Sequence, residues 1–363
     1  MKKNKNYVDL KDQPVPEGQH LLEVDDLKMY FHTEDGVVRA VDGVSYTLDR
    51  GETLGVVGES GSGKSVTAMT IMGLISMPPG KIEGGDVRYR GRSILEMTEE
   101  EMQHIRGNDI AMIFQDPMTS LNPVYKIGKQ VGEGLRLHRG YSKQEALKRA
   151  TELLDLVGIP EPEKRVNEYP HQFSGGMRQR VMIAMALACD PDILIADEPT
   201  TALDVTIQAQ IIELMQEMQE KNGNAIIMIT HDLGVVADMA DKIMVMYAGR
   251  PVEFGTADEI FYESRHPYTW GLIRSIPEQA IDEKKPLTPI HGNPPSLMNL
   301  PQGCVFSPRC PYATDKCRKQ RPERVVTESG HYSACHYSGD PEFLKNAPET
   351  SRTRKDSKKG GEA

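Results

Sequence analysis

The sequence has no apolar run long enough to span a membrane. Its apolar runs are short, such as the one from Ala225 to Ile229, whereas a transmembrane helix needs about 20 apolar residues. The first residues, Met1 to Asn4, lead into polar sequence and not into the apolar core of a signal peptide. We therefore expect a cytosolic chain.

Positive charge is also in short supply. The 43 Lys and Arg residues are outnumbered by 53 Asp and Glu residues, which gives a formal net charge of -10. A protein that binds nucleic acid without regard to sequence needs excess positive charge facing the phosphates. We therefore expect no nucleic-acid partner. The length of 363 residues suits one large domain with an appendage, or two domains.

Cysteine is scarce, and the chain has five. That number is too small for a disulfide scaffold, but Cys304, Cys310, Cys317 and Cys335 lie close together near the C-terminus. In a reducing compartment, such a group suggests a metal site. Cys189 stands alone in an apolar segment, and we expect it to be a small buried residue and no ligand.

What the sequence does contain is a glycine-rich segment, Gly58 to Ser65, with the spacing G-x-x-x-x-G-K-S/T. The apolar run Thr53 to Val57 predicts a buried strand before it, and Val66 to Ile75 predicts a helix whose N-terminal dipole would face bound phosphates. Lys64 would reach the β- and γ-phosphates of ATP, and Ser65 would ligate Mg²⁺. A glycine-rich turn that binds nothing would not need this order of strand, loop, lysine, hydroxyl and helix. The residues expected to contact ATP here are Gly58, Glu59, Ser60, Gly61, Ser62, Gly63, Lys64, Ser65 and Val66.

Two further apolar runs end in polar side chains. The run Ile193 to Ala196 leads into Asp197 and Glu198. In a P-loop ATPase, one acid enters the magnesium shell and the next serves the attacking water, so we assign Asp197 to the metal and Glu198 to catalysis. An exposed acidic pair is the alternative, and it fits poorly with the apolar residues before it. Ala225 to Ile229 is followed by His231 near the carboxyl end of a strand, where ligands gather in open α/β sheets; a structural histidine is the alternative.

The N-terminal part predicts a tail and a β-hairpin. Residues 1–20 are polar, and we expect a flexible tail. Leu21 to Phe31 and Val37 to Leu48 predict the two strands of the hairpin. Phe31 is our candidate for stacking on the adenine ring, with Tyr30 as an equally placed competitor and an ordinary strand aromatic as the alternative.

Residues 116–180 predict a helical insertion in the nucleotide fold. One of its helices opens with a capping box formed by Ser142 and Glu145. The insertion leads to the run Ser174 to Gly176, where a serine N-cap and two glycines leave backbone amides open at a helix N-terminus. This run predicts a second anion site.

Together, these segments resemble the nucleotide-binding domain of ATP-binding cassette (ABC) proteins over about residues 21–265. The motifs that carry the resemblance are Walker A (Gly58 to Ser65), the Q-loop (Gln115), the signature (Phe173 to Met177), Walker B (Ile193 to Asp197), the catalytic carboxylate (Glu198), the D-loop (Thr201 to Asp204) and the switch histidine (His231). The resemblance implies an α/β fold, in which a P-loop ATPase domain has a RecA-like core, an antiparallel β subdomain and a helical subdomain at about residues 116–180.

The resemblance also implies roles for individual residues. Gln115 would join Ser65 and Asp197 at Mg²⁺, and it would act in catalysis with Glu198 and His231. The remaining residues implied to bind nucleotide are Ser174, Gly175, Gly176 and Asp204. The signature of one domain in this family covers the ATP held by another domain, and this chain has one copy of each motif. We therefore expect it to work as half of a pair.

The C-terminal part resembles a narrower group of ABC proteins. Residues 266–338, with His266-Pro267-Tyr268-Thr269 and the four cysteines, are similar to the C-terminal extension of the ATPase subunits of oligopeptide and dipeptide importers, and Gln115 to Pro123 is similar to their D-type subunit. The resemblance implies an ATPase that drives peptide uptake, peripheral at the cytoplasmic face of the cell membrane. Its implied partners are a second, F-type ATPase subunit, two membrane permeases and an external peptide-binding protein. Importers of nickel complexes or sugar oligomers, a soluble ABC ATPase and an exporter with separate permeases remain alternatives. Residues 339–363 are polar and are expected to be a disordered tail.

The four C-terminal cysteines have the spacing C-x5-C-x6-C-x17-C, in a segment too short for a core of its own. Four thiolates there suggest a closed metal site that folds the segment, which makes the extension a metal-binding one. Zinc ribbons favour paired C-x2-C knuckles, which are missing, whereas iron–sulfur clusters tolerate wider spacing. The D-type subunits that this region resembles are known to carry a 4Fe-4S cluster there. We expect an iron–sulfur cluster; zinc and unligated or disulfide-paired cysteines remain alternatives.

Overall fold

The computed structural model describes residues 10–116, 120–200, 205–276 and 290–348. Within these residues, the centre of the molecule is a sheet of eight strands in the order β11-β12-β10-β9-β3-β8-β7-β6. The strands from β9 to β6 run parallel, and β10, β12 and β11 continue the sheet through antiparallel pairs. Their bounds are β3 (Thr53–Val57), β6 (Ile110–Ile113), β7 (Ile193–Asp197), β8 (Ala225–Thr230), β9 (Lys242–Tyr247), β10 (Arg250–Thr256), β11 (Val325–Val326) and β12 (Tyr332–Ser333). The apolar runs therefore predicted the parallel core correctly.

A second, smaller sheet has the order β2-β1-β4-β5, and each of its pairs is antiparallel. Its bounds are β1 (Leu22–Thr33), β2 (Gly36–Leu48), β4 (Gly80–Tyr89) and β5 (Arg92–Ser93). The pairing of Thr33 with Gly36 closes the predicted hairpin. Side chains of this sheet share one hydrophobic cluster with the central sheet, so the antiparallel β subdomain packs directly on the ATPase core.

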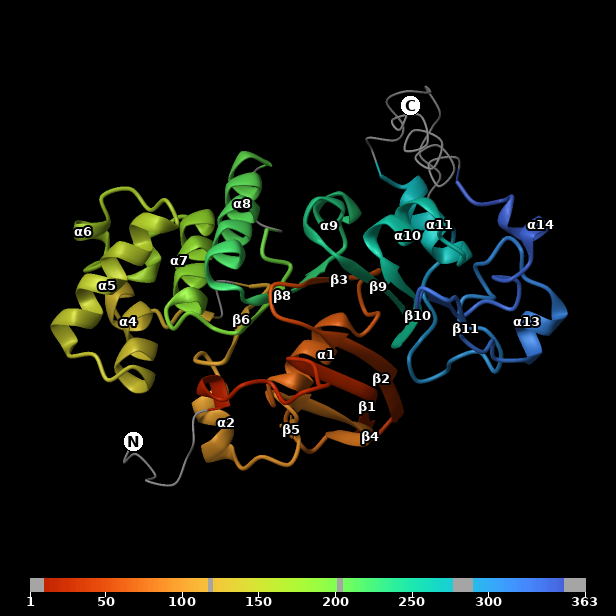
Figure 1. Cartoon of the computed structure of the whole chain (residues 1–363), viewed down its shortest axis with the longest axis horizontal. Coiled ribbons are helices and arrows are strands. Elements are labelled where there is room, and N and C mark those ends of the chain that lie inside the picture. The colour runs from red at the N-terminus through yellow and green to blue at the C-terminus, as the bar shows by residue number, and fades with distance from the viewer. Residues whose placement is uncertain (1–9, 117–119, 201–204, 277–289, 349–363) are drawn as a thin grey trace.

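Four helices gather at one end of the molecule, on the left of Figure 1. They are α4 (Ile127–His138), α5 (Lys143–Leu156), α6 (Pro162–Arg165) and α7 (Gly175–Leu187). The capping box of Ser142 and Glu145 opens α5 as predicted. These helices form the helical subdomain, and α7 leads from it into β7 of the core.

The remaining helices surround the two sheets. α1 begins at Lys64 and ends at Ile71, earlier than the predicted end at Ile75, because Gly73 has a φ of +61° that stops a helix. None of the described helices is long and apolar enough to cross a membrane. The other bounds are η1 (Leu10–Asp12), α1 (Lys64–Ile71), α2 (Glu99–Ile105), η2 (Pro170–Gln172), α8 (Val205–Asn222), α9 (Leu233–Met239), α10 (Ala257–Tyr262), α11 (Pro267–Arg274), α13 (Asp315–Lys319) and α14 (Pro341–Leu344).

The C-terminal extension, defined here as the described residues from 266 to 348, continues the central sheet. β12 pairs with β10, and the rings of Phe254 and Tyr332 stack 5.6 Å apart across this pair. The buried carboxylate of Glu253 in β10 accepts a hydrogen bond from the N–H of His266 at 3.2 Å and lies 3.0 Å from Nε2 of His331. Because a buried carboxylate needs such partners, these contacts fix the start of the extension to the edge of the ATPase core.

Described residues within both predicted tails pack against the fold. Leu10 is buried in the cluster between the two sheets, and Nζ of Lys11 donates to the carbonyl of Cys189 at 3.1 Å. At the other end, α14 brings the ring of Phe343 to 5.3 Å from that of Trp270. The expected flexible tail at 1–20 and disordered tail at 339–363 are therefore wrong for the parts around Leu10 and Phe343. In each case, a few apolar side chains in a polar segment, such as Leu10 and Val15 in the first, find hydrophobic partners.

Candidate active site

The glycine-rich loop connects β3 to α1, as predicted, and two of its glycines cannot be replaced without a clash. Gly63, the N-cap of α1, has a φ of +99°, and a Cβ there would lie 2.2 Å from the carbonyl oxygen of Ala40. Gly58 has a φ of +152°, and a Cβ there would lie 2.2 Å from the carbonyl oxygen of Met246. The loop therefore curls tightly against β2 and β9, with its backbone amides at the N-terminus of a helix, where anions bind.

Lys64 is buried inside this loop. Its Nζ donates to the carbonyl oxygens of Gly58 at 2.7 Å and Glu59 at 3.0 Å. Burial lowers the pKa of Lys64, and the nearby carboxylates of Glu198, Asp197 and Glu59 act in the opposite direction. The ammonium is thus held by the loop that would also receive the phosphates.

Ser65 and Asp197 form a pair suited to a hard cation. Oγ of Ser65 donates to Oδ1 of Asp197 at 3.0 Å, and Asp197 is the last, buried residue of β7. Burial raises the pKa of the Asp197 carboxyl, and the hydrogen bond from Ser65 opposes that rise. Hydroxyl and carboxylate oxygens are the ligands that Mg²⁺ prefers, so these two residues fit the predicted magnesium site.

The three residues predicted to be catalytic lie together. Nε2 of Gln115 donates to Oε2 of Glu198 at 3.0 Å, and Nδ1 of His231 lies 3.4 Å from Oε1 of Glu198. Glu198 has a φ of +47°, and its N–H donates to the carbonyl of Ile229 in β8 at 2.8 Å. The residues follow β6, β7 and β8, whose carboxyl ends meet at one edge because these strands are parallel neighbours.

The predicted signature lies elsewhere in the molecule. Ser174 is the N-cap of α7, and its Oγ accepts a hydrogen bond from the N–H of Met177 at 3.3 Å. Ser174 and Gly175 are exposed, and a Cβ on Gly175 would meet open space. In Figure 1, α7 stands with the helical subdomain, apart from α1. The open N-terminus of α7 is therefore separate from this chain's own phosphate loop.

The adenine candidate and the D-loop complete the predicted nucleotide contacts. Phe31 is half-buried at the end of β1 and packs, like Val66, against the cluster between the two sheets. The competing ring, Tyr30, donates its hydroxyl to Oδ1 of Asp42 at 2.9 Å. Asp204 and the rest of the segment 201–204 lie outside the described residues.

Two residues of the C-terminal extension reach the phosphate loop, and motif analysis did not place them there. The hydroxyl of Tyr268 accepts a hydrogen bond from the N–H of Glu59 at 2.9 Å. The guanidinium of Arg309 pairs with both carboxylate oxygens of Glu59. The His-Pro-Tyr-Thr segment marked Tyr268 in the sequence without indicating a target, and no motif marked Arg309.

The four C-terminal cysteines are brought together. They line one small cavity with His266, Tyr312 and Phe343, and all of them are free thiols. Burial raises the pKa of Cys304, that of Cys310 to about 11 and that of Cys335 to about 12. Among the described residues, no group of three or more His, Cys, Asp or Glu side chains is placed to hold a metal ion, so the structure does not show the predicted metal site of the extension. The buried Cys189 lies in the core of the helical side, away from this cavity.

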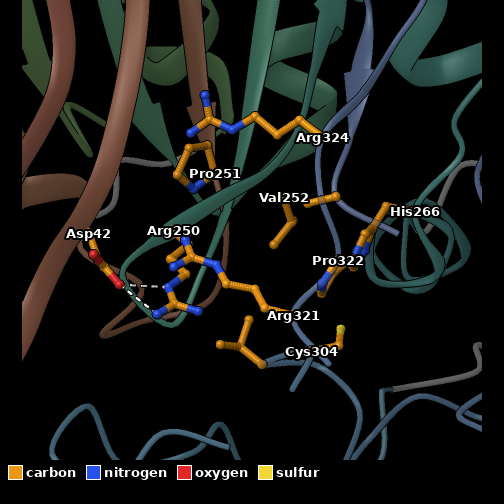
Figure 2. Close-up of a pocket in the computed structure, with 11 residues that line it drawn as sticks. Asp42, Arg250, Pro251, Val252, His266, Cys304, Arg321, Pro322 and Arg324 are labelled. Atoms are coloured by element: carbon orange, nitrogen blue, oxygen red, sulfur yellow. Dashed lines mark hydrogen bonds and ion pairs between the residues drawn. The ribbon is translucent and has the colours of Figure 1, made fainter. Parts of the chain in front are cut away.

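Cys304 also lines a second pocket, which holds three arginines (Figure 2). There, Arg250 of β10 forms an ion pair of 2.6 Å with Asp42 of β2, and Arg324 of the extension donates to the carbonyl of Gly43 at 2.5 Å. These contacts join the antiparallel sheet, β10 and the extension. The extension is therefore fastened to two sides of the ATPase core.

Comparisons with known proteins cover both halves of this architecture. A family model described as ABC transporter matches residues 41–201, and one described as oligopeptide/dipeptide transporter, C-terminal region, matches residues 252–317. The oligopeptide transport ATP-binding protein OppD of Bacillus subtilis (strain 168) is 58% identical over 312 residues, which cover 86% of this chain and 87% of that protein. The dipeptide transport ATP-binding protein DppD of Escherichia coli (strain K12) is 52% identical over 320 residues, 88% of this chain and 97% of that protein. Among solved structures, a dimeric ATP-binding cassette in a post-hydrolysis state, bound to ADP and Pi, matches 65% of this chain and 98% of its own with a TM-score of 0.60 and 29% identity.

Proposed function

This chain belongs to the ATP-binding subunits of oligopeptide and dipeptide ABC transporters, and on that basis we propose that it hydrolyses ATP to drive uptake of oligopeptides or dipeptides across the cytoplasmic membrane. The observation that carries the proposal is the meeting of the phosphate loop, the Ser65–Asp197 pair and the Gln115–Glu198–His231 group at one edge of the central sheet. The extension supports peptide transport, because it is the part matched by the oligopeptide/dipeptide family.

We assign the chemistry as follows. The loop amides and Lys64 hold the phosphates, and Ser65, Asp197 and Gln115 hold Mg²⁺, which would neutralise charge on the β- and γ-phosphates. Glu198 orients and deprotonates the attacking water. Gln115 and His231 flank the two oxygens of Glu198 at 3.0 and 3.4 Å, so they fix its direction and can report the state of the γ-phosphate.

We further propose that the chain works as one cassette of a pair, with an F-type ATPase subunit as its partner. The run Ser174 to Gly176 at the start of α7, with Ser174 and Gly175 exposed and Gly176 half-buried, is separate from this chain's α1, so it is available to cover ATP bound by the partner. The likeness to a dimeric cassette supports this arrangement. Asp204, which is outside the described residues, stays a predicted nucleotide contact.

The permease contact belongs to the helical subdomain in this proposal. α4 and α5 border a groove lined by basic side chains, among them Lys129 and Arg136, and by apolar ones such as Leu147. Nearby Val124 and Tyr125 are exposed. We infer that a cytoplasmic segment of one of the two membrane permeases docks here, which would hold the subunit at the cytoplasmic face of the membrane. An external protein would deliver the peptide.

The extension is proposed to hold a 4Fe-4S cluster at Cys304, Cys310, Cys317 and Cys335. The donor set suits it, because four buried or half-buried thiols border one cavity and thiolates are the usual ligands of iron–sulfur clusters. Their spacing along the chain lacks the paired C-x2-C knuckles of zinc ribbons, which favours a cluster over zinc. Bound there, the group would tie the extension together; a role in electron transfer is not needed.

The test of the proposal is transport by the assembled complex. The chain, its partner ATPase subunit, two permeases and the binding protein are reconstituted in vesicles with ATP at the ATPase side. Labelled di- and oligopeptides should move toward the ATPase side only when ATP and Mg²⁺ are present. Movement in the opposite direction, or uptake of nickel complexes or sugar oligomers in place of peptides, would contradict the proposed cargo and direction.

A further inference from the structure

Glu59, inside the phosphate loop, is held from outside the ATPase core. Nη1 and Nη2 of Arg309 lie 2.5 and 3.0 Å from the two carboxylate oxygens of Glu59, which makes a bidentate pair. The N–H of Glu59 donates to the hydroxyl of Tyr268 at 2.9 Å. Both the side chain and the backbone of this loop residue are therefore bound to the C-terminal extension, 209 and 250 residues further along the chain.

Arg309 is also held in place by residues outside the phosphate loop. Its side chain is 4% exposed, Nε donates to the carbonyl of His291 at 2.9 Å, and Nη2 donates to the carbonyl of Ile290 at 3.1 Å. The guanidinium also lies 5.8 Å from the ring centre of Tyr247. Pairing with Glu59 strengthens the charged form of Arg309 and raises its pKa. These contacts hold the guanidinium in one position beside Glu59.

Tyr268 is equally constrained. It is fully buried, and its ring packs 4.6 Å from Tyr247 and 5.3 Å from Phe306. Burial raises its pKa, so the hydroxyl keeps its proton and accepts from Glu59 through a lone pair. The N–H of Glu59 is thus engaged by Tyr268, and the contact of Glu59 with phosphate stays a prediction.

The negative charge of Glu59 explains why the contacts from Arg309 and Tyr268 are needed. A carboxylate in a loop that surrounds a triphosphate repels the ligand unless a cation compensates it. Arg309 supplies that cation and draws the carboxylate toward the extension, while Tyr268 holds the backbone at the same residue. Glu59 also shares its carbonyl with Nζ of Lys64 at 3.0 Å, so displacement of Glu59 would displace the lysine that binds phosphate.

We propose that Arg309 and Tyr268 are positioning residues of the nucleotide site, through which the C-terminal extension sets the affinity of the phosphate loop for ATP. The inference rests on the proposed ATPase function. The inference also connects the four-cysteine cavity with the nucleotide site. Cys310, which follows Arg309, and Pro267, which precedes Tyr268, both line that cavity.

A double-mutant cycle on the assembled transporter tests the proposal. R309Q leaves Glu59 unpaired beside the phosphates, and we expect its KM for ATP and its Kd for a fluorescent ATP analogue to rise about tenfold, with kcat changed less than threefold. E59Q removes the charge and should stay within about threefold of wild type, and the double variant E59Q/R309Q should recover most of the lost affinity. Y268F, which keeps the ring and loses the acceptor oxygen, should weaken binding by a smaller factor.

The matched control is R318Q, because Arg318 lies in the same extension but is 60% exposed and pairs only locally with Asp315. Its KM and Kd should equal those of wild type. A Kd within twofold of wild type for R309Q overturns the proposal, and so does a double variant that binds as weakly as R309Q, since that result means general damage to the fold. If wild type itself fails to bind the analogue, the proposed ATPase function fails, which is a different outcome.

Discussion

Replacement of Glu198 by Gln isolates the chemical step, because it removes one negative charge and keeps the shape of the side chain. Oε2 of Glu198 receives a hydrogen bond from Gln115 at 3.0 Å, and Oε1 faces His231 at 3.4 Å. The amide oxygen of the new side chain can still accept from Gln115, so the end of β7 should keep its conformation. The variant loses the carboxylate that would orient the water and take its proton.

The size of the effect follows from the kind of group removed. A positioned general base contributes about 10²- to 10⁴-fold to a rate, which corresponds to about 3 to 5 kcal/mol of barrier. We therefore expect kcat to fall at least a hundredfold. ATP affinity should be equal or higher, since Lys64 keeps its contact with Gly58 and Ser65 keeps its contact with Asp197. One negative charge near the triphosphate also disappears.

Both quantities are measured on the assembled transporter, kcat by phosphate release and Kd with a fluorescent ATP analogue. The control is E152Q, because Glu152 forms an exposed pair with Arg149 on α5, far from the nucleotide site. Its kcat and Kd should match wild type. Hydrolysis by E198Q within threefold of wild type would refute the assignment of the base, and loss of ATP binding would refute the separation of binding from chemistry.

The remaining predictions concern other parts of the site. K64A should weaken binding of the ATP analogue at least tenfold by removing the ammonium inside the loop, and unchanged binding would contradict the loop assignment. G175D puts a carboxylate at the open start of α7, where a Cβ meets no atom, so it should stop hydrolysis of the partner's ATP without lowering this chain's own ATP affinity; normal turnover would contradict the pairing. C335S, purified without oxygen, should lose iron and acid-labile sulfide and melt several degrees lower than wild type, whereas retained iron would remove Cys335 from the ligand set. In metal-free protein, the raised pKa values of Cys310 (about 11) and Cys335 (about 12) favour neutral thiols, so alkylation should be slow at pH 8 and keep accelerating up to about pH 11; a plateau near pH 9 would show ordinary exposed thiols.

The phosphate loop and the strands that carry the acids could be predicted from the sequence because their signals are local. The run Thr53–Val57 is apolar and continuous since parallel strands are buried on both faces. A Cβ at Gly63 would lie 2.2 Å from a carbonyl oxygen, so only glycine fits there. The glycine spacing therefore reflects a steric limit that applies to loops of this kind. The convergence of Gln115 with Glu198 follows from the parallel order of β6 and β7.

The contacts of the extension could not be predicted in this way. Arg309 and Glu59 are 250 residues apart, and neither stands in a pattern whose period or spacing points to the other. The packing of Leu10 and Phe343 was missed for a related reason, because composition averages over a segment while one apolar side chain is enough to anchor it. Such contacts depend on the folded surface that the rest of the chain presents.

The order of the strands in the central sheet explains how two distant parts of the chain both contact one nucleotide site. On one side of β3, which carries the phosphate loop, β8, β7 and β6 lead to the helical side. On its other side, β9 and β10 lead to the extension, which begins in the sheet with β12. From the first side, Gln115 reaches Glu198; from the second, Arg309 reaches Glu59. Each contact ends on a glutamate at the nucleotide site, one placed to act on the attacking water and one to shape the phosphate loop. In the two proposals made above, the sides act separately: the helical side, where a permease would dock, governs the chemical step, and the extension governs the affinity for ATP.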